Sequence, residues 1–429
     1  MSSTEKGRGV LVMDPTVVVV PSSWAGRVRR GSVGRVTGDE QMIRIGMVCP
    51  YSLSIPGGVQ AQVLGLARQL RRMGREVRVL GPCDGPPPDT FVTPLGNSLP
   101  TAANGSIAPL APDPAAALRT MRVLFEEQFD VLHLHEPFAP GPTMTSILLH
   151  PAPVVATFHA AGTSASYKYL SRPIRASAEN IARRVAVSKD AEALVSAAIG
   201  GEYEVLFNGV ELDAYRSSPA WPTDGPTIFF YGRHEERKGL DVLLEALPDL
   251  PDDVTLWIAS DGPDTERLRA ATAGDRRVQW LGRIDEAEKI ARLKGATIFC
   301  APSLRGESFG VVLIEAMAAG TCIVASSLDG YRNVATDDVD SLLPPPGDVA
   351  ALTASLRRAL DDAGLRERLE AAGQTRADDF SMVALAEAYD AMYRELASGH
   401  RRTQQRAGLR RLSAWPRVPR RGRAPRRMA

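Results

Sequence analysis

The chain has 429 residues, of which 44% are hydrophobic and 24% charged, values ordinary for a soluble globular protein that is long enough for two domains. No apolar run approaches the roughly 20 residues needed to cross a bilayer, so the sequence predicts no membrane span. The four cysteines show no CxxC or Cys/His ligand spacing, which argues against a zinc site and favours a reducing cytoplasm.

The net charge of +1 is the sum over regions that differ in the sign of their charge. Residues 42–397 hold 34 basic and 46 acidic residues, whereas residues 398–429 hold 11 Arg and no Asp or Glu. We expect residues 1–41, which lack a sustained hydrophobic period, to be a disordered extension, and the Arg-rich tail 398–429 to be disordered as well. The tail could tether the acidic body to anionic lipid or stay solvated, and the sequence leaves both open.

Between these ends the chain alternates predicted strands and helices in two series. The first series has strands at 43–49, 77–79, 131–134, 154–158 and 184–187, with a helix at 59–73. The second has strands at 227–231, 255–259, 278–281, 297–301 and 322–325, with helices at 240–247, 286–293 and 309–319.

A segment at 213–226, with four Pro or Gly residues and little apolar content, separates the two series and is predicted to be a linker. The alternation predicts an α/β fold with two doubly wound, Rossmann-like domains facing a cleft. We place these domains at residues 42–212 and 213–380, and an amphipathic helix at 381–397 closes the folded part.

The most informative motif is Gly306-Glu307-Ser308-Phe309-Gly310, followed by Glu315 in an apolar helix. Glu307 would lie at the helix entrance, where free N–H groups can bind phosphate, with Glu315 about two turns further on and on a similar face of the helix. Carboxylates accept hydrogen bonds from sugar hydroxyls, so the motif suggests a nucleotide sugar. The alternative is a capping Glu307 and a solvated Glu315. However, a carboxylate on a helix that is apolar all round is costly unless something binds it.

Two further groups fall at the carboxyl ends of predicted strands. Gly57-Gly58, between a strand and a helix, lets the backbone approach a ligand. Arg233 and Lys238 follow the first strand of the second series, and two cations there suit a diphosphate leaving group. The plainer alternatives are a tight turn that happens to use glycine and a solvated, charged loop.

Histidines also end strands of the first series. His159 follows the strand at 154–158, where it is either a functional residue or a hydrogen-bonded structural one. His133 and His135 share one face of their strand. No third ligand accompanies that pair, so the case for a metal site is weak and we predict none.

Together these residues resemble the retaining family 4 glycosyltransferases of the GT-B fold over about residues 42–397. The markers are the Gly-Glu-Ser-Phe-Gly motif with its second glutamate, the Arg233–Lys238 pair, Asp261-Gly262-Pro263 and Asn208-Gly209-Val210. Within the family, residues 47–52, 56–60, 104–106, 135–137 and 156–159 are similar to the phosphatidylinositol mannosyltransferases of actinobacteria.

That resemblance implies transfer of mannose from GDP-mannose to the inositol of a membrane phospholipid, with retention of configuration. It implies a cytoplasmic enzyme that is peripheral on the inner face of the plasma membrane. The nucleotide sugar and the phospholipid are its expected partners, with no cofactor, no metal and no nucleic acid.

The resemblance also implies roles for single residues. Arg233 and Lys238 would neutralise the leaving phosphates, Glu315 would hold the ribose, and Glu307 the donor sugar. The implied catalytic residues are His159, Glu307, Arg233 and Lys238. The implied donor-binding residues are Gly57, Gly58, Ile284, Lys289, Ser308, Phe309, Gly310 and Glu315, and the implied acceptor-binding residues are Tyr51, Gln60 and Asn104.

Three positions depart from the mannosyltransferase pattern, and all three would serve the inositol phosphate. The pattern has an acid before Pro-Gly-Gly, where this chain has Ser54 or Ile55. It has a lysine five residues after the histidine, where this chain has Ser164, and a basic residue soon after Asn-Gly-Ser, where this chain has Pro109. The residues expected at the donor end are therefore intact, whereas the lipid acceptor stays open. The sequence also does not fix the sugar and base of the donor, the linkage or the oligomeric state. The alternatives are a UDP-sugar donor with a soluble or different lipid acceptor, and a non-catalytic nucleotide-sugar-binding protein.

Overall fold

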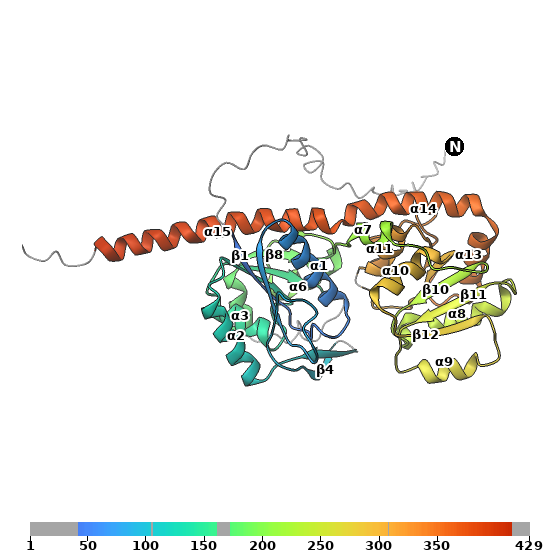
Figure 1. Cartoon of the computed structure of the whole chain (residues 1–429), viewed down its shortest axis with the longest axis horizontal. Helices are drawn as coiled ribbons and strands as arrows, with labels where there is room; N and C mark the ends of the chain where they lie inside the picture. The colour runs from blue at the N-terminus through green and yellow to red at the C-terminus, as the bar shows by residue number, and fades with distance from the viewer. Residues whose placement is uncertain (1–41, 104–105, 161–171, 308, 414–429) are drawn as a thin grey trace, which may run out of the picture. The chain divides into compact units, whose positions relative to one another are not determined.

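A computed structural model describes residues 42–103, 106–160, 172–307 and 309–413 of the chain (Figure 1). It contains two parallel sheets that follow each other along the sequence, the first within residues 44–205 and the second within residues 227–325. We call the parts built around them the first and the second half.

The first sheet has the strand order β3-β2-β1-β6-β7-β8-β9, and every neighbouring pair is parallel. The chain builds outward from β1 to β3 and then crosses to β6 on the other side, so the order reverses between β1 and β6. Ligands of such sheets bind beyond the carboxyl ends of the strands at this switch point. The strands are β1 (Arg44–Val48), β2 (Glu76–Gly81), β3 (Val92–Pro94), β6 (Val131–His135), β7 (Val154–Phe158), β8 (Ile181–Ala186) and β9 (Glu204–Val205).

Helices connect these strands, as parallel pairing requires. In α1, Leu66 and Leu70 recur at helical spacing and are buried against the sheet, and the helix ends before Gly74, whose φ is +83°. The helices of this half are α1 (Gly58–Arg72), α2 (Pro114–Glu126), α3 (Pro142–Leu149), α5 (Arg172–Ser177) and α6 (Lys189–Ile199), and a hairpin is formed by β4 (Leu99–Ala103) and β5 (Ser106–Leu110).

The second sheet has the order β12-β11-β10-β13-β14, again parallel throughout, with its switch point between β10 and β13. Its strands are β10 (Thr227–Tyr231), β11 (Thr255–Ala259), β12 (Val278–Gly282), β13 (Ile298–Ala301) and β14 (Cys322–Ala325). Its helices are α7 (Leu212–Ser217), α8 (Leu240–Ala246), α9 (Thr265–Ala271), α10 (Glu286–Gly295), α11 (Val311–Ala319), α12 (Asp329–Arg332), α13 (Val349–Asp361) and α14 (Ala363–Ala377).

The central helix of the second half is α11, which is apolar nearly all round. It begins after Gly310, with φ +83°, and ends before Gly320, with φ +77°, while Leu313, Ile314 and Met317 lie fully buried in the core. A helix without a polar face needs cover on all sides, and α7, α10, α14 and β14 supply it.

The last helix, α15 (Met382–Ser413), returns to the first half and packs on α1 (Figure 1). Its Asp390 is buried and pairs with Arg75 at 2.6 Å. Two predictions need correction here. The helix continues through residues 398–413, which we expected to be disordered, and residues 414–429 lie outside the described part. The predicted linker contains α7, because Leu212 and Tyr215 are buried in the second core.

The other strand and helix predictions agree with the structure to within a few residues at each end. Cys300 and Cys322 lie buried in strands and Cys49 directly after one, and all four cysteines are free. No helix in the described ranges is both long and apolar enough to cross a membrane. The extension 1–41 lies outside the described residues.

Candidate active site

The loops that follow β10 and β13 meet at the switch point of the second sheet. Lys238 Nζ lies 2.5 Å from Glu307 Oε1, and the amide of Leu304 donates to the carbonyl of Arg237 at 2.8 Å. Gly239, which follows Lys238 in the first of these loops, has φ +68°. A Cβ on Gly239 would lie 1.9 Å from the carbonyl oxygen of Pro302 in the second loop. Only glycine allows this approach, so the local sequence itself brings the two loops together.

Glu307 is held by more than the lysine. Ser303 Oγ donates to Oε1 at 3.0 Å, and a guanidinium nitrogen of Arg237 lies 3.5 Å from the same oxygen. The side chain of Glu307 is only 11% exposed. Since α11 begins at Val311, Glu307 precedes the helix, and our expectation that it shares a helical face with Glu315 is wrong. Ser308 lies outside the described residues.

Arg233 is placed differently from Lys238. Its side chain is half exposed, and its guanidinium lies 3.6 Å from a carboxylate oxygen of Glu235. Within the described part of the chain it makes no ion pair with Glu307. Because half of the side-chain surface is exposed, Arg233 remains accessible to an anionic ligand.

Glu315 has an internal partner. Lys289 Nζ lies 2.9 Å from Glu315 Oε1 and 2.9 Å from Glu286 Oε1, and Lys289 is 5% exposed. Burial acts to lower the pKa of Lys289, but the two carboxylates outweigh it, and the pKa is raised. We argued from the sequence that a carboxylate on this helix needs something bound to it, and Lys289 meets that need.

Three other residues predicted to bind the donor lie around α11. The ring of Phe309 is 1% exposed and stacks on Phe207 with centroids 5.2 Å apart, so this side chain lies in the core, and donor binding by this residue stays a prediction. It belongs to the core because α11 is covered on every side. Gly310 precedes the first turn of α11, and Ile284, between β12 and α10, is half-buried against the same core.

In the first half, the loop after β1 leads into α1 through Gly57 and Gly58. A Cβ on Gly58 would meet nothing within 4 Å, so this backbone is open to a ligand. Gln60 is buried and donates to the carbonyl of Ser52 at 3.3 Å, which orders its own loop. Tyr51 is half-buried, and burial, followed by the charge of Glu136, raises its pKa. Asn104 lies outside the described residues.

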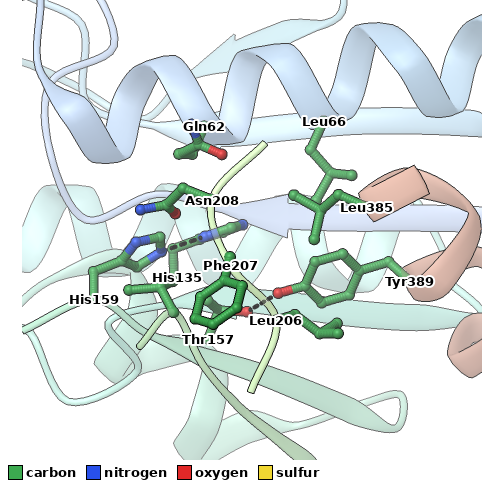
Figure 2. A pocket seen from close by; sticks show the side chains of 11 residues that line it. Gln62, Leu66, His135, Thr157, His159, Leu206, Phe207, Asn208, Leu385 and Tyr389 are labelled. Carbon is green, nitrogen blue, oxygen red and sulfur yellow. Dashed lines mark hydrogen bonds between the residues drawn. The ribbon is translucent and has the colours of Figure 1, made fainter. Parts of the chain in front are cut away.

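His159 follows β7 and faces a second histidine. Its Nε2 lies 3.0 Å from Nδ1 of His135, as the dashed line in Figure 2 shows. Glu136 accepts hydrogen bonds from the backbone N–H groups of His159 and Ala160, both at 2.6 Å. Glu136 has φ +50°, a conformation that persists where the surroundings determine it. Burial lowers the pKa of His159 to about 3, so the ring is neutral.

A hydroxyl and imidazole network lies behind this pair. His133 Nε2 lies 2.7 Å from Thr157 Oγ1, and its Nδ1 lies 2.6 Å from the hydroxyl of Tyr393. Thr157 is also 2.8 Å from the hydroxyl of Tyr389. Burial, followed by the charge of His159, lowers the pKa of His133 to about 3. Thus β6, β7 and α15 share one uncharged network.

His135 and His159 line a pocket in the first half (Figure 2). Its wall is completed by α1, the segment 206–208 and α15. Across it, the Gln62 side chain donates to the carbonyl of Gly209 at 2.7 Å and accepts from the amide of Gly209 at 2.9 Å. In the described ranges, no three His, Cys, Asp or Glu side chains gather as a metal site would require. The absence of a metal requirement stays a prediction.

Comparison with known proteins decides the family. The model of "Glycosyltransferase Family 4" matches residues 56–214, and that of "Glycosyl transferases group 1" matches residues 212–376. A phosphatidyl-myo-inositol mannosyltransferase of Mycobacterium leprae is 43% identical, covering 80% of this chain and 94% of the relative. One of Mycobacterium tuberculosis is 41% identical with the same coverage. The chain is a family 4 glycosyltransferase.

The fold of this glycosyltransferase is GT-B. Sucrose-phosphate synthase of Thermosynechococcus elongatus superposes with a TM-score of 0.68, covering 83% of this chain and all of that one. At 20% identity that likeness concerns the fold alone.

Sequence reasoning missed several residues that contact or surround the predicted site residues. Gln62, Arg237 and Ser303 were not predicted, nor was Tyr331, whose hydroxyl lies 3.0 Å from Ser303 Oγ, and Glu136 was noted only as part of a motif. Arg237 carried a signal, because it stands between two residues that were predicted. Ser303 and Gln62 carried none, since each is an ordinary polar residue whose partner lies elsewhere in the fold.

Proposed function

We propose that this glycosyltransferase transfers mannose from GDP-mannose to the inositol of phosphatidylinositol, with retention of configuration. The observation that carries the donor assignment is the Lys238–Glu307 contact at the switch point of the second sheet, which holds a phosphate-binding cation beside a carboxylate suited to sugar hydroxyls. The acceptor assignment is supported by the names of the relatives, of which this chain covers 94%.

The proposed reaction is a front-face displacement. The bond between the anomeric carbon and the diphosphate oxygen breaks, and a bond to an inositol oxygen forms on the same face. The inositol hydroxyl gives its proton to the departing diphosphate. Lys238 and Arg233 stabilise the charge on that leaving group, and fixed cations of this kind typically supply several kcal/mol.

Each half then has its own task. In the second half, Glu307 accepts hydrogen bonds from the mannose hydroxyls, and Glu315 accepts them from the ribose. Gly58 presents open backbone to the diphosphate. His159 contacts the donor sugar and the acceptor near the reacting carbon. It does so as a neutral ring, because burial lowers its pKa to about 3, so it can accept or donate a hydrogen bond without adding charge.

The acceptor would be met at the inner face of the plasma membrane, where the enzyme is a peripheral protein. The Arg-rich residues of 398–429 would support attachment to anionic lipid, at about 1 kcal/mol for each basic residue near the surface. Deleting residues 398–429 and measuring sedimentation with phosphatidylinositol-containing liposomes tests this part. Unchanged binding would remove the tether.

The central test is an activity screen with the full chain. GDP-mannose and UDP-sugars are each crossed with phosphatidylinositol and with soluble acceptors, and the anomeric configuration of the product is read by NMR. We expect product only from GDP-mannose with phosphatidylinositol, in the α configuration of the donor, and the same rate with EDTA. A UDP-sugar or a soluble acceptor as the preferred substrate contradicts the assignment. Neither transfer nor donor hydrolysis would indicate a non-catalytic binding protein.

A further inference from the structure

The carboxylate of Glu307 is anchored unevenly. Lys238 and Ser303 both donate to Oε1, and Arg237 approaches the same oxygen. Among the described residues, no hydrogen bond reaches Oε2. A carboxylate has room for about four donors, so Oε2 remains able to accept hydrogen bonds from a sugar. The donors on Oε1 therefore fix the direction in which Oε2 points.

Ser303 is itself fixed by a tyrosine. Its Oγ lies 3.0 Å from the hydroxyl of Tyr331, and the two residues are 2% and 1% exposed. A serine hydroxyl has one hydrogen, and Ser303 donates it to Glu307. Tyr331 must therefore be the donor to Ser303. The two hydrogen bonds are therefore donated in the same direction, from Tyr331 to Ser303 and from Ser303 to Glu307.

The ring of Tyr331 is held tightly in place. It comes from α12, and a Cβ at Gly310 would lie 2.7 Å from its Cδ1, so the glycine before α11 makes room for it. Burial, followed by the charge of Glu307, raises the pKa of Tyr331 well above its usual value, so the hydroxyl keeps its proton. A rigid, protonated hydroxyl at this position can donate to Ser303 and so fix the direction of the Ser303 hydroxyl.

The two kinds of anchor on Glu307 differ in what they do when donor binds. Lys238 is charged and its side chain is 19% exposed, so a diphosphate would draw it away from the carboxylate. Ser303 and Tyr331 are uncharged and buried, and neither would follow the phosphate. After the lysine turns to the leaving group, these two hydroxyls still hold Glu307.

We propose that Ser303 and Tyr331 are positioning residues that keep Glu307 directed at the donor sugar. This inference rests on the proposed role of Glu307 in sugar binding. The competing explanation is that Tyr331 only fills the core. Tyr331→Phe distinguishes the two, because it keeps the ring and removes the hydroxyl.

The experiment compares Ser303→Ala, Tyr331→Phe, the double variant and Ser303→Thr in the full chain. Kinetics are measured with the nucleotide sugar, and calorimetry gives the affinity for the free nucleoside diphosphate. Because Ser303 donates a hydrogen bond to a charged group, we expect Ser303→Ala to lower kcat/KM about tenfold. For Tyr331→Phe we expect a smaller loss, about threefold. Diphosphate affinity should stay within about twofold in all variants, because Glu307 meets the sugar and not the phosphate.

The double variant gives the sharpest test. If Tyr331 acts only through Ser303, the double variant is no worse than Ser303→Ala, because residues in one chain of hydrogen bonds are not additive. Ser303→Thr keeps the hydroxyl and should retain most of the activity. Wild-type kinetics in Tyr331→Phe, multiplied losses in the double variant, or a parallel loss of diphosphate affinity would each overturn the proposal.

The matched control is Tyr203→Phe in the first half. It also removes a tyrosine hydroxyl, one that donates to the carbonyl of Gly200 at 2.9 Å, and we expect wild-type kinetics. If the enzyme proves to use a UDP-sugar, the proposed donor fails. The ranking of the variants, measured with that sugar and with UDP, still decides the role of Ser303 and Tyr331.

Discussion

The two halves of this glycosyltransferase hold their site residues by different physics. In the second half, opposite charges are paired, Lys238 with Glu307 at 2.5 Å and Lys289 with Glu315 at 2.9 Å. In the first half, the rings of His133, His135 and His159 lie together, no residue in the described ranges forms a salt bridge with any of them, and burial lowers the pKa of each. Under the proposed function, the fixed cations of the second half suit an anionic leaving group, whereas the neutral rings of the first half can exchange hydrogen bonds with hydroxyls without adding charge.

The contrast also bears on how the two groups of site residues are stabilised. A buried ion pair is costly to form and more costly to break, because the surviving partner remains charged and desolvated. A neutral network loses one hydrogen bond at a time. Removing single partners from the two halves should therefore give losses of different size.

The largest effect is expected from Lys289→Met. It leaves Glu315 in a largely apolar surrounding without its lysine, and breaking a buried pair costs about 3–5 kcal/mol of unfolding free energy. Denaturant unfolding measures the loss. Adding Glu315→Leu should restore part of it, because the buried charge of Glu315 is then gone and Glu286, the second partner of Lys289, is 66% exposed and stays solvated. A loss below about 1 kcal/mol for the single variant would contradict the account.

Turnover should respond most to the second charged pair. Lys238→Ala and Glu307→Ala are each expected to lower kcat about 100-fold or more, since each removes an interaction that grows in the transition state. Arg305→Ala is the matched control, because its pair with Glu236 in the same region is exposed on both sides. Near-normal turnover in either site variant would sink the assignment of this pair.

The sequence made the second half easier to predict than the first. A glutamate in an apolar helix and a lysine after a strand are visible as exceptions to their surroundings, and the strand positions followed from apolar runs. The ion pair of Lys289 with Glu315 was not predicted, although both residues were named, because pairing depends on how α10 packs on α11.

Burial was the main thing that the sequence did not reveal. Phe309 belongs to the motif that we predicted to bind the donor, yet its ring is in the core. The contacts of α15 with β6 and β7 join residues more than 200 positions apart, and no local pattern encodes them. The same limit applies to Ser303 and Tyr331.

The neutral histidines predict a pH dependence. Folding lowers the pKa of His133 from about 6.5 to about 3, so below pH 6.5 the unfolded chain binds more protons and stability falls as the pH falls. Between pH 6.5 and 5 one such histidine accounts for about 2 kcal/mol. His133→Gln should reduce the loss between pH 7.5 and 5 by about that amount. His150→Asn, at an exposed position, should leave this loss unchanged. If His133→Gln loses as much unfolding free energy between pH 7.5 and 5 as the wild type, His133 is not the cause of the pH dependence.

The smallest effect is expected from Tyr389→Phe. The variant keeps the ring, whose centroid lies 4.7 Å from that of His133, and removes only the hydroxyl bonded to Thr157. Thr157 retains His133 as a partner, so no buried group is left unsatisfied, and the expected loss is about 1 kcal/mol. Denaturant unfolding beside Lys289→Met compares the two halves directly. A loss as large as that of Lys289→Met would mean that the network acts as one unit. The absence of charge would then not make the histidine and hydroxyl network more tolerant of losing a single partner.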